Sequence, residues 1–435
     1  MEIFAILLFI FIFLLILSGY PVAFTLGGLS VIFGLIFLGP DFFNFLPSRI
    51  MGTVTNVVLL AVPLFIFMGI MLEKSGLAES LLETMAMLFG TMKGGLAISV
   101  VIVGALLAAS TGIVGATVIT MGLISLPTML KRGYSTELAT GTIAASGTLG
   151  QIIPPSVVLV LLGSVLNVSV GDLFAAALVP GILLVLCYII YIVGYSLVYP
   201  EKAPSMPAEE IAAFRGEGFA LRVLKAFLLP LVLIAAVLGS ILAGIASPTE
   251  ASAIGALGAT ILTIIQGKFS WEILKEVMQE TTHLTTMVFI ILIGATTFAL
   301  VFRGMGGDDY LIDLIEGANL SPMGFLFLVM IVVFIAGFFI DFIEIIFIIV
   351  PVVAPIFANY DMNLVWIGIL LALNLQTSFL SPPFGFSLFY LKGVAPDGVT
   401  TQHLYRGIIP FVLIQLVFLV AVIFFPEIVF LLIEK

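Results

Sequence analysis

Two stretches of this 435-residue chain place small polar residues inside strongly apolar sequence. The first, GYSTELATGTIAASGTLGQIIPPS, runs from Gly133 to Ser156, and the second, NYDMNLVWIGILLALNLQTSFLSPPF, runs from Asn359 to Phe384. Each has a tyrosine near its start, passes through Ser, Thr or Gln, and reaches a pair of prolines at or near its end. Interrupted helices at matching places in two halves of a membrane chain indicate the binding site of a secondary transporter.

The proline pairs decide which chemistry is available. Proline has no backbone N–H, so the carbonyl four residues earlier loses its helical partner. Pro154 therefore frees the carbonyl of Gly150, and Pro382 frees that of Ser378. Free carbonyls beside hydroxyl groups suit a small dehydrated cation, and Na⁺ held by unwound backbone is the expected use. We predict one Na⁺ site at each break, with an organic anion between them near the half-helix N-termini.

Composition identifies the surroundings of these motifs as a lipid bilayer. Apolar residues make up 62% of the chain, charged residues 9%, and the mean hydropathy is +1.33. A soluble domain carries roughly 25% charged residues, so we predict an all-α polytopic membrane protein. The net charge of −10 argues against nucleic-acid binding and against a polybasic lipid-docking surface. The single Cys187 excludes an internal disulfide and a cysteine-based metal cluster.

The apolar runs predict the same series of elements in each half. In the first half they are spans at Ile3–Ser18, Val22–Leu38 and Val57–Met71, an amphipathic stretch at Leu77–Met92, an interrupted block at Gly95–Leu130, a broken span at Leu138–Leu166 and a span at Leu173–Val198. In the second half they are Val223–Leu242, Ala251–Gln266, Thr285–Val301, the amphipathic Asp309–Glu316, the interrupted Met323–Phe357, the broken Leu364–Leu391 and the last span Ile408–Leu432. Phe4–Leu17 lacks a basic n-region and a cleavage site, so it is predicted as a membrane helix.

Each interrupted block is predicted to be a re-entrant hairpin of two half-length helices. The first has its tip at Ser110-Thr111-Gly112, and the second has its tip between Gly337 and Asp341. Backbone without hydrogen-bond partners is tolerated at membrane depth only inside protein or beside a wet cavity. We therefore expect each tip to lie opposite one of the breaks.

Basic residues predict the orientation of the chain. With each hairpin returning to its own side, both halves cross five times and have opposite topology. With the N-terminus outside, 12 of the 15 basic residues fall on the cytoplasmic face, as the positive-inside rule requires, and both termini are periplasmic. Only Arg49, Arg303 and Lys435 are predicted on the outer face.

Several candidate residues come directly from the tips and breaks. Ser110, Gly112 and Gly147 are candidates for the first cation site, and Asp341 and Gln376 for the second. Thr148, Ser156, Asn374 and Thr377 are candidates for contact with the organic anion.

Plainer interpretations remain open for some of these residues. Asp341 and Glu344 are intramembrane carboxylates and hence functional candidates, although a wet cavity would leave them merely hydrated. Arg303 either reaches the interface or binds substrate, and the first is the simpler reading. Small and hydroxyl residues near the first tip also allow close helix packing.

Four segments resemble the large membrane subunit of tripartite ATP-independent periplasmic (TRAP) transporters. They are ASTGIVGATVITMGLISLPTMLKRGYSTELATGTIAASGTLGQIIPPS, SGYPVAFTLGG near the start, SPTEASAIGALGA at Ser247–Ala259 and PPFGFSLFYLKGVAP at Pro382–Pro396. The resemblance covers essentially the whole chain and implies the fold of the ion-transporter superfamily: two inverted-topology repeats, each with a re-entrant hairpin and a broken helix, working as an elevator. The repeats would be 1–198 and 223–435, joined by a cytoplasmic linker at 199–222. In the first, 1–72 would be scaffold, 77–92 an arm and 95–198 the moving part; in the second, these would be 223–303, 305–318 and 323–435.

The resemblance also implies function and partners. The family couples Na⁺ entry to uptake of organic acids such as C4-dicarboxylates across the bacterial inner membrane. A periplasmic binding protein of DctP type delivers the acid, and a small membrane subunit of DctQ type braces the scaffold. Carried over residue by residue, the first Na⁺ site would use Thr111, Gly150, Ile153 and Pro155, and the second Gly337, Ser378, Ser381 and Phe384. No cofactor beyond Na⁺ and no enzymatic activity is implied.

Three other functions remain as alternatives. A stand-alone Na⁺/carboxylate symporter of the same superfamily would work without a binding protein. An intramembrane aspartyl protease is disfavoured because Met305 stands where its G-x-G-D motif needs glycine, and H-E-x-x-H and G-x-S-x-G motifs are absent from the sequence. A purely structural membrane subunit would leave the paired broken helices unexplained.

Overall fold

The protein is built from helices of very unequal length. The computed structural model describes residues 2–111, 114–207, 209, 211 and 219–433, and the regular structure in these ranges is helical. Six of the described helices are long and apolar enough to cross a membrane, or seven when a bent pair is counted as one span. The prediction of an all-α polytopic membrane protein is therefore confirmed.

The helices of the first half follow the predicted order. They are α1 (Glu2–Leu17), α2 (Val22–Phe37), α3 (Leu46–Val54), α4 (Ala61–Lys74), α5 (Leu77–Phe89), α6 (Gly95–Thr111), α7 (Val114–Lys131), α8 (Thr136–Thr148), α9 (Val157–Leu166) and α10 (Val170–Val198). Short 3₁₀ turns η1 (Pro40–Phe45), η2 (Val57–Leu60), η3 (Leu149–Gln151) and η4 (Pro200–Lys202) lie between them.

The helices of the second half also follow the order predicted for it. Its helices are α12 (Phe219–Leu242), α13 (Pro248–Ile265), α14 (Trp271–Gly304), α15 (Gly307–Gly317), α16 (Pro322–Ala336), α17 (Phe342–Ile348), α18 (Val350–Asn359), α19 (Leu364–Leu380), α20 (Phe386–Val394) and α21 (Thr401–Phe424). The 3₁₀ turns η5 (Pro426–Ile428) and η6 (Phe430–Leu432) follow.

Both predicted helix breaks are present. In the first half α8 gives way to η3 and an irregular turn before α9, and in the second α19 ends at Leu380 and α20 starts at Phe386. Both Pro–Pro peptide bonds in these breaks are cis. The breaks lie where proline removes the helical donor, so a local property of the sequence explains them.

The tyrosines of the two motifs close the bases of the two hairpins. The backbone N–H of Leu96, at the start of α6, donates to the Tyr134 hydroxyl 3.2 Å away, just beyond the end of α7. In the second half the Tyr360 hydroxyl donates to the carbonyl of Leu320 at 3.1 Å, just before α16. Each hairpin therefore returns to the end from which it started, and the paired tyrosines have the same structural role.

Two helix limits, one additional helix and one bend differ from the sequence-based expectation. α14 begins at Trp271 rather than near Thr285, because the Ser270 side chain caps it and its polar first half is paired with α4. α21 ends at Phe424 rather than Leu432, since Pro426 cannot continue the helix. α3 was not expected, because its nine residues are far fewer than the roughly 20 of a membrane span. The return limb of the second hairpin bends by 51° between α17 and α18, beside Pro351.

The first hairpin also differs in size from the expectation. Its limbs α6 and α7 have 17 and 18 residues, about 25–27 Å at 1.5 Å per residue. Half of a bilayer core is only about 15 Å, so the prediction of two half-length helices is wrong for this hairpin.

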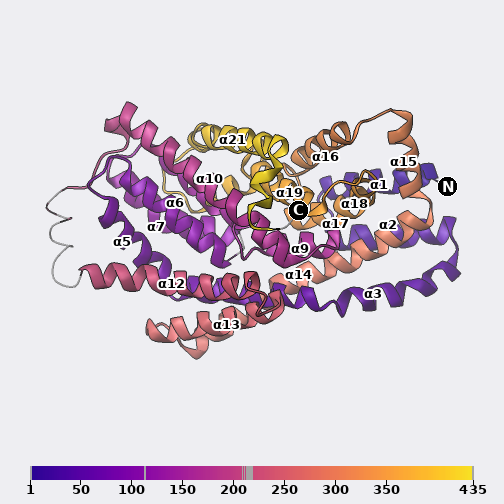
Figure 1. Cartoon of the computed structure of the whole chain (residues 1–435), viewed down its shortest axis with the longest axis horizontal. Helices are drawn as coiled ribbons and strands as arrows, with labels where there is room; N and C mark the ends of the chain where they lie inside the picture. Colours follow the sequence, from indigo (N-terminus) through magenta and orange to yellow (C-terminus); the bar gives the residue numbers. More distant parts are fainter. Residues whose placement is uncertain (1, 112–113, 208, 210, 212–218, 434–435) are drawn as a thin grey trace.

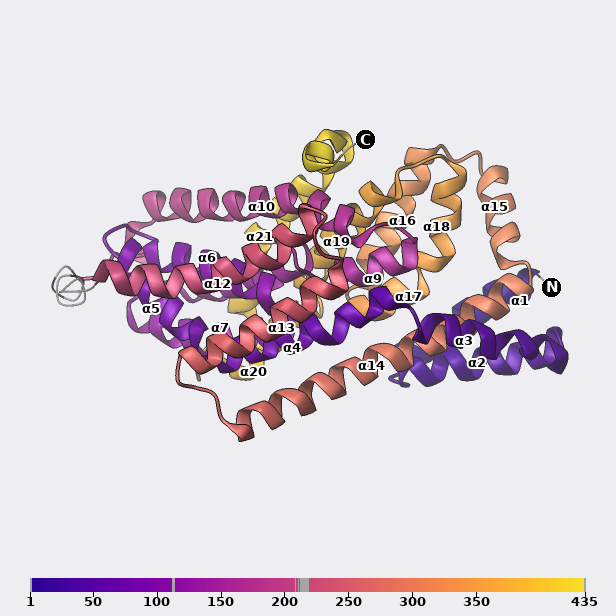
Figure 2. The ribbon, with the colours of Figure 1, turned by 60° about the horizontal axis from the view of Figure 1, so that its bottom comes forward.

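The helices gather into two groups. α14 lies along α2, α3 and α4, and α13 packs on α4 (Figure 2). α6, α7 and α21 surround α8, while α19 contacts α9, α16 and α21. Along the long axis of the molecule α5, α6 and α7 lie toward one end, and α15 and the N-terminus lie at the other (Figure 1).

Candidate functional site

The first hairpin meets the first break at Gly150. A Cβ placed on Gly150 would lie 2.6 Å from the Ala108 carbonyl oxygen of α6, so only glycine permits this approach. Ala108 lies two residues before the predicted tip, so the end of α6 lies against the break, as the prediction requires. Gly112 and the side chains of Ser110 and Thr111 lie outside the described part of the chain.

The second hairpin meets the second break in the same way. A Cβ on Gly337, at the end of α16, would overlap the Ser378 hydroxyl of α19. One turn earlier the Asn374 amide donates to the Met330 carbonyl of α16 at 2.7 Å. The predicted substrate residue Asn374 therefore anchors the hairpin to the broken helix.

The hydroxyl groups at the breaks are oriented as acceptors. Ser381 donates to the Thr377 carbonyl at 2.8 Å, Thr377 to Leu373 at 2.7 Å, and Ser378 to Leu375 at 2.9 Å. Each hydroxyl donates its hydrogen bond to a carbonyl of its own helix, so its lone pairs remain available to another group. This arrangement suits a cation.

The same pattern occurs at the first break. Ser156 donates to the Gln151 carbonyl at 2.9 Å, and Thr148 donates to the Ala145 carbonyl at 2.9 Å. Ser156 and Thr148 are fully buried. Both predicted substrate residues therefore lie inside the protein, beside the break.

A buried glutamine distinguishes the first break from ordinary packing. The amide of Gln151, which the sequence analysis did not single out, is fully buried and finds no hydrogen-bond partner among the described residues. Native proteins rarely leave buried polar atoms without protein, water or ligand partners. A glutamine between a glycine and a proline pair was the signal that could have identified it.

Gln376 lies on a different face of α19 from Ser378. It is two positions from Ser378 on α19, about 200° around the helix, so it faces away from the Gly337 contact. The structure places it beside the Tyr188 hydroxyl of α10, at a geometry short of a full hydrogen bond, and next to the buried Gln415 that bonds the same hydroxyl. Gln376 therefore lies on another face of α19 than the Gly337–Ser378 contact, and its part in the second cation site stays a prediction.

Asp341 starts a helix at the second tip. Its carboxylate accepts the backbone N–H of Ile343 at 2.9 Å, and Glu344 accepts the N–H of Asp341 at 3.3 Å, which forms a capping box for α17. Capping of α17 is the role that the contacts show for Asp341.

The remaining candidates occupy different places. Gly147 packs against Val118 of α7, and Ile153 packs against Gly181 of α10. Pro155 is buried. Phe384 is 46% exposed, with its ring 5.5 Å from that of Phe339 near the second tip.

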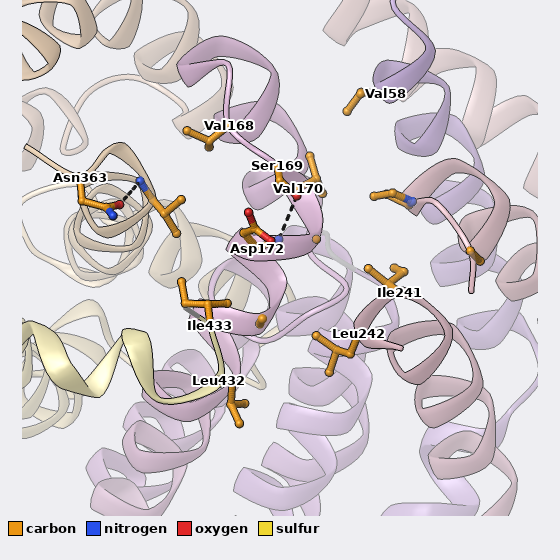
Figure 3. A pocket seen from close by; sticks show the side chains of 15 residues that line it. Val58, Val168, Ser169, Val170, Asp172, Ile241, Leu242, Asn363, Leu432 and Ile433 are labelled. Carbon is orange, nitrogen blue, oxygen red and sulfur yellow. Dashed lines mark hydrogen bonds between the residues drawn. The ribbon is translucent and has the colours of Figure 1, made fainter. Parts of the chain in front are cut away.

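Two open cavities lie near these elements. The larger, about 960 Å³, is formed by the start of α10, the α12–α13 loop, the start of α19 and the C-terminal segment (Figure 3). Its polar side chains Ser169 and Asn363 are engaged in capping helices, and Asp172 is its only charged side chain among the described residues. It is poorly suited to an anion.

The second cavity has the opposite electrostatic character. It measures about 800 Å³ and lies between α3, α9, α14 and the α17–α18 bend. Arg49 and Arg303 line it, together with Thr53, Thr296, Asn56 and Asn167. Arg303, for which the sequence left both an interfacial position and substrate contact open, lies in the wall of this cavity.

Comparisons with known proteins agree with the fold. The family described as "Tripartite ATP-independent periplasmic transporter, DctM component" matches residues 9–428. The C4-dicarboxylate TRAP transporter large permease protein DctM of Pseudomonas aeruginosa is 32% identical over 404 residues, covering 92% of each chain. The sialic acid TRAP transporter large permease protein SiaM of Vibrio cholerae is 28% identical, covering 97% of this chain and 96% of SiaM. The YdaH transporter of Alcanivorax borkumensis has a similar fold, with a TM-score of 0.65 at 14% identity over 98% of this chain and 99% of that one.

Proposed function

Because this chain belongs to the DctM family of TRAP transporters, as a large permease subunit, we propose that it carries an organic acid inward together with Na⁺. The observation that supports this most directly is the meeting of two hairpins with two broken helices. Gly150 lies against Ala108, and Gly337 lies against Ser378. Near both places hydroxyls keep lone pairs available. Pro154 leaves the Gly150 carbonyl without its usual helical donor, whereas the Ser378 carbonyl, expected to be free, accepts the Ser381 N–H at 3.0 Å because α19 ends in a tighter turn. One Na⁺ would bind at each break.

The hairpins give the ions a way to act on the protein. A cation held between a tip and a break binds the hairpin to the transport helices, and the organic anion then binds where the two tips approach. The halves 1–198 and 223–435 would be inverted repeats joined by 199–222, and the hairpins with α8–α10 and α19–α21 would move as an elevator. Two Na⁺ ions offset the charge of a dicarboxylate, which favours joint movement through a low-dielectric environment.

Partners and location follow from the same proposal. A DctQ-type small membrane subunit would brace the scaffold, and a DctP-type periplasmic binding protein would deliver the acid at the outer face of the bacterial inner membrane. Both termini would be periplasmic. Similar permeases named for a C4-dicarboxylate and for sialic acid show that sequence similarity at this level leaves the acid open.

Uptake in proteoliposomes tests the proposal. The chain is reconstituted with its small subunit, and a panel of C4-dicarboxylates and sialic acid is offered with and without an inward Na⁺ gradient and added binding protein. We expect uptake to require both, and Gly150→Ala to weaken Na⁺ activation because it pushes α6 away from the break. Gly194→Ala, at a helical position with open space around it, is the matched control. Uptake that ignores the Na⁺ gradient would overturn the proposal.

The nearest alternative is a stand-alone Na⁺/carboxylate symporter. The same assay separates it, because such a protein would transport fully on Na⁺ alone without any binding protein.

A further inference from the structure

The cavity of about 800 Å³ beside α3 combines charge, polar groups and an apolar wall. Arg49 comes from α3 and Arg303 from the end of α14. Phe42 and Phe45 line the cavity too, with their rings edge to face at 6.1 Å. No carboxylate lines it within the described part of the chain. A guanidinium and an aromatic wall together suit a small organic anion, which has a charged end and a carbon skeleton.

The two arginines are not equivalent. Arg303 forms an ion pair with Asp308, Nε to Oδ2 at 3.1 Å, and its Nη2 reaches the Pro351 carbonyl at 3.5 Å. The positive charge of Arg303 is therefore largely compensated by groups of the protein itself. Arg49 is exposed and has no carboxylate partner among the described residues. The uncompensated positive charge of the cavity is that of Arg49.

The walls of the cavity come from both groups of helices. Thr53 of α3 and Thr296 of α14 lie within hydrogen-bond distance of each other at 3.1 Å, on the predicted scaffold side. Asn56 donates to Ser164 of α9 at 3.2 Å, which links that side to a helix predicted to move. An anion in this cavity therefore contacts the fixed and the moving parts at once.

We propose that this cavity is an entry subsite, in which Arg49 draws the carboxylate of the organic acid from the outer face before it reaches the hairpin tips. The identity of the cargo rests on the proposed function, whereas anion attraction by Arg49 does not. Guanidinium is suited to this task because its planar N–H groups match a carboxylate, and α3 places it on an open wall.

Charge-selective modification of a cysteine tests the subsite without knowledge of the cargo. Cys187 is the only cysteine, so Cys187→Ala with Ser48→Cys places a single thiol in the cavity wall beside Arg49. The full chain with its small subunit, in right-side-out vesicles, is treated with an anionic or a cationic methanethiosulfonate reagent. At about 10 mM ionic strength, a positive charge about 7 Å from the thiol in water raises the rate of the anionic reagent roughly threefold and lowers that of the cationic reagent roughly threefold.

Arg49→Gln should lower the ratio of anionic to cationic rates at Ser48→Cys by about five- to tenfold. Arg49→Lys should keep the ratio, and about 1 M salt should abolish the effect. Lys275→Gln, an exposed lysine at the other end of α14, is the control and should change nothing. An unchanged ratio in Arg49→Gln, or a thiol that reacts only after the vesicles are opened, would overturn the inference. Either result leaves the Na⁺ dependence of uptake, and so the proposed function, to its own assay.

Discussion

Replacing Gly337 by alanine should show whether the second hairpin tip rests on the broken helix. Gly337 has φ −66° and ψ −8°, a conformation that alanine adopts freely, so the substitution acts through contact alone. The new methyl group would lie 2.5 Å from Ser378 Cβ and overlap its hydroxyl. Because carbon atoms pack at about 3.5–4.0 Å, tip and helix must separate by roughly 1 Å. Overpacking of this kind costs about 1–3 kcal/mol.

A double-mutant cycle isolates that contact. Ser378→Gly alone removes a side chain from the interior of α19 and should cost about 1 kcal/mol. Combined with Gly337→Ala it also removes the atoms that clash, so the double variant should be more stable than the sum of the single effects by about 1–2 kcal/mol. The measurement is the apparent Tm of the purified protein in one detergent at fixed Na⁺, supported by the Na⁺ activation curve of uptake.

The control pair is Gly194→Ala with Ser378→Gly. Nothing lies within 4 Å of a Cβ on Gly194, so these two substitutions should be additive. If Gly337→Ala leaves Tm unchanged, or if its effect adds simply to that of Ser378→Gly, the tip does not rest on the break and the second cation site loses its support.

Two further predictions concern contacts elsewhere in the same elements. Burial raises the pKa of Tyr134 to about 12 from 10.0, so the contribution of the neutral Tyr134 hydroxyl to stability is complete below pH 10 and is lost as the pH rises through 12. Tyr134→Phe should lower Tm at pH 8, because the hydrogen bond from Leu96 is lost. The difference in Tm between this variant and the unsubstituted protein should narrow between pH 10 and 12. A constant gap would contradict this. Thr120 of α7 donates to the half-buried Glu73 of α4 at 2.8 Å. Thr120→Val should lower the free energy of unfolding by about 1–3 kcal/mol because the carboxylate loses its donor, whereas Thr120→Ser should keep Tm. Equal Tm values for the two variants would count against the contact.

Local features of the sequence were enough for the broken helices. Pro154 and Pro382 cannot donate a backbone hydrogen bond to the preceding turn in any fold, so the two breaks can be predicted from residue type and spacing. The membrane environment and the order of spans are equally local, because apolar runs of sufficient length carry that information. The paired Tyr134 and Tyr360 were visible as a repeat, although their role at the hairpin bases was not.

Tertiary structure decided which of these residues meet. Ser378 and Gln376 are two positions apart, yet one faces Gly337 and the other lies beside Tyr188, because the helix turns about 100° per residue and its neighbours choose the faces. Arg49 lines a cavity because α3, a short helix that was not expected, places it near the end of α14. Such contacts join segments far apart in the chain, and close packing of whole helices sets them rather than any local preference of the residues involved.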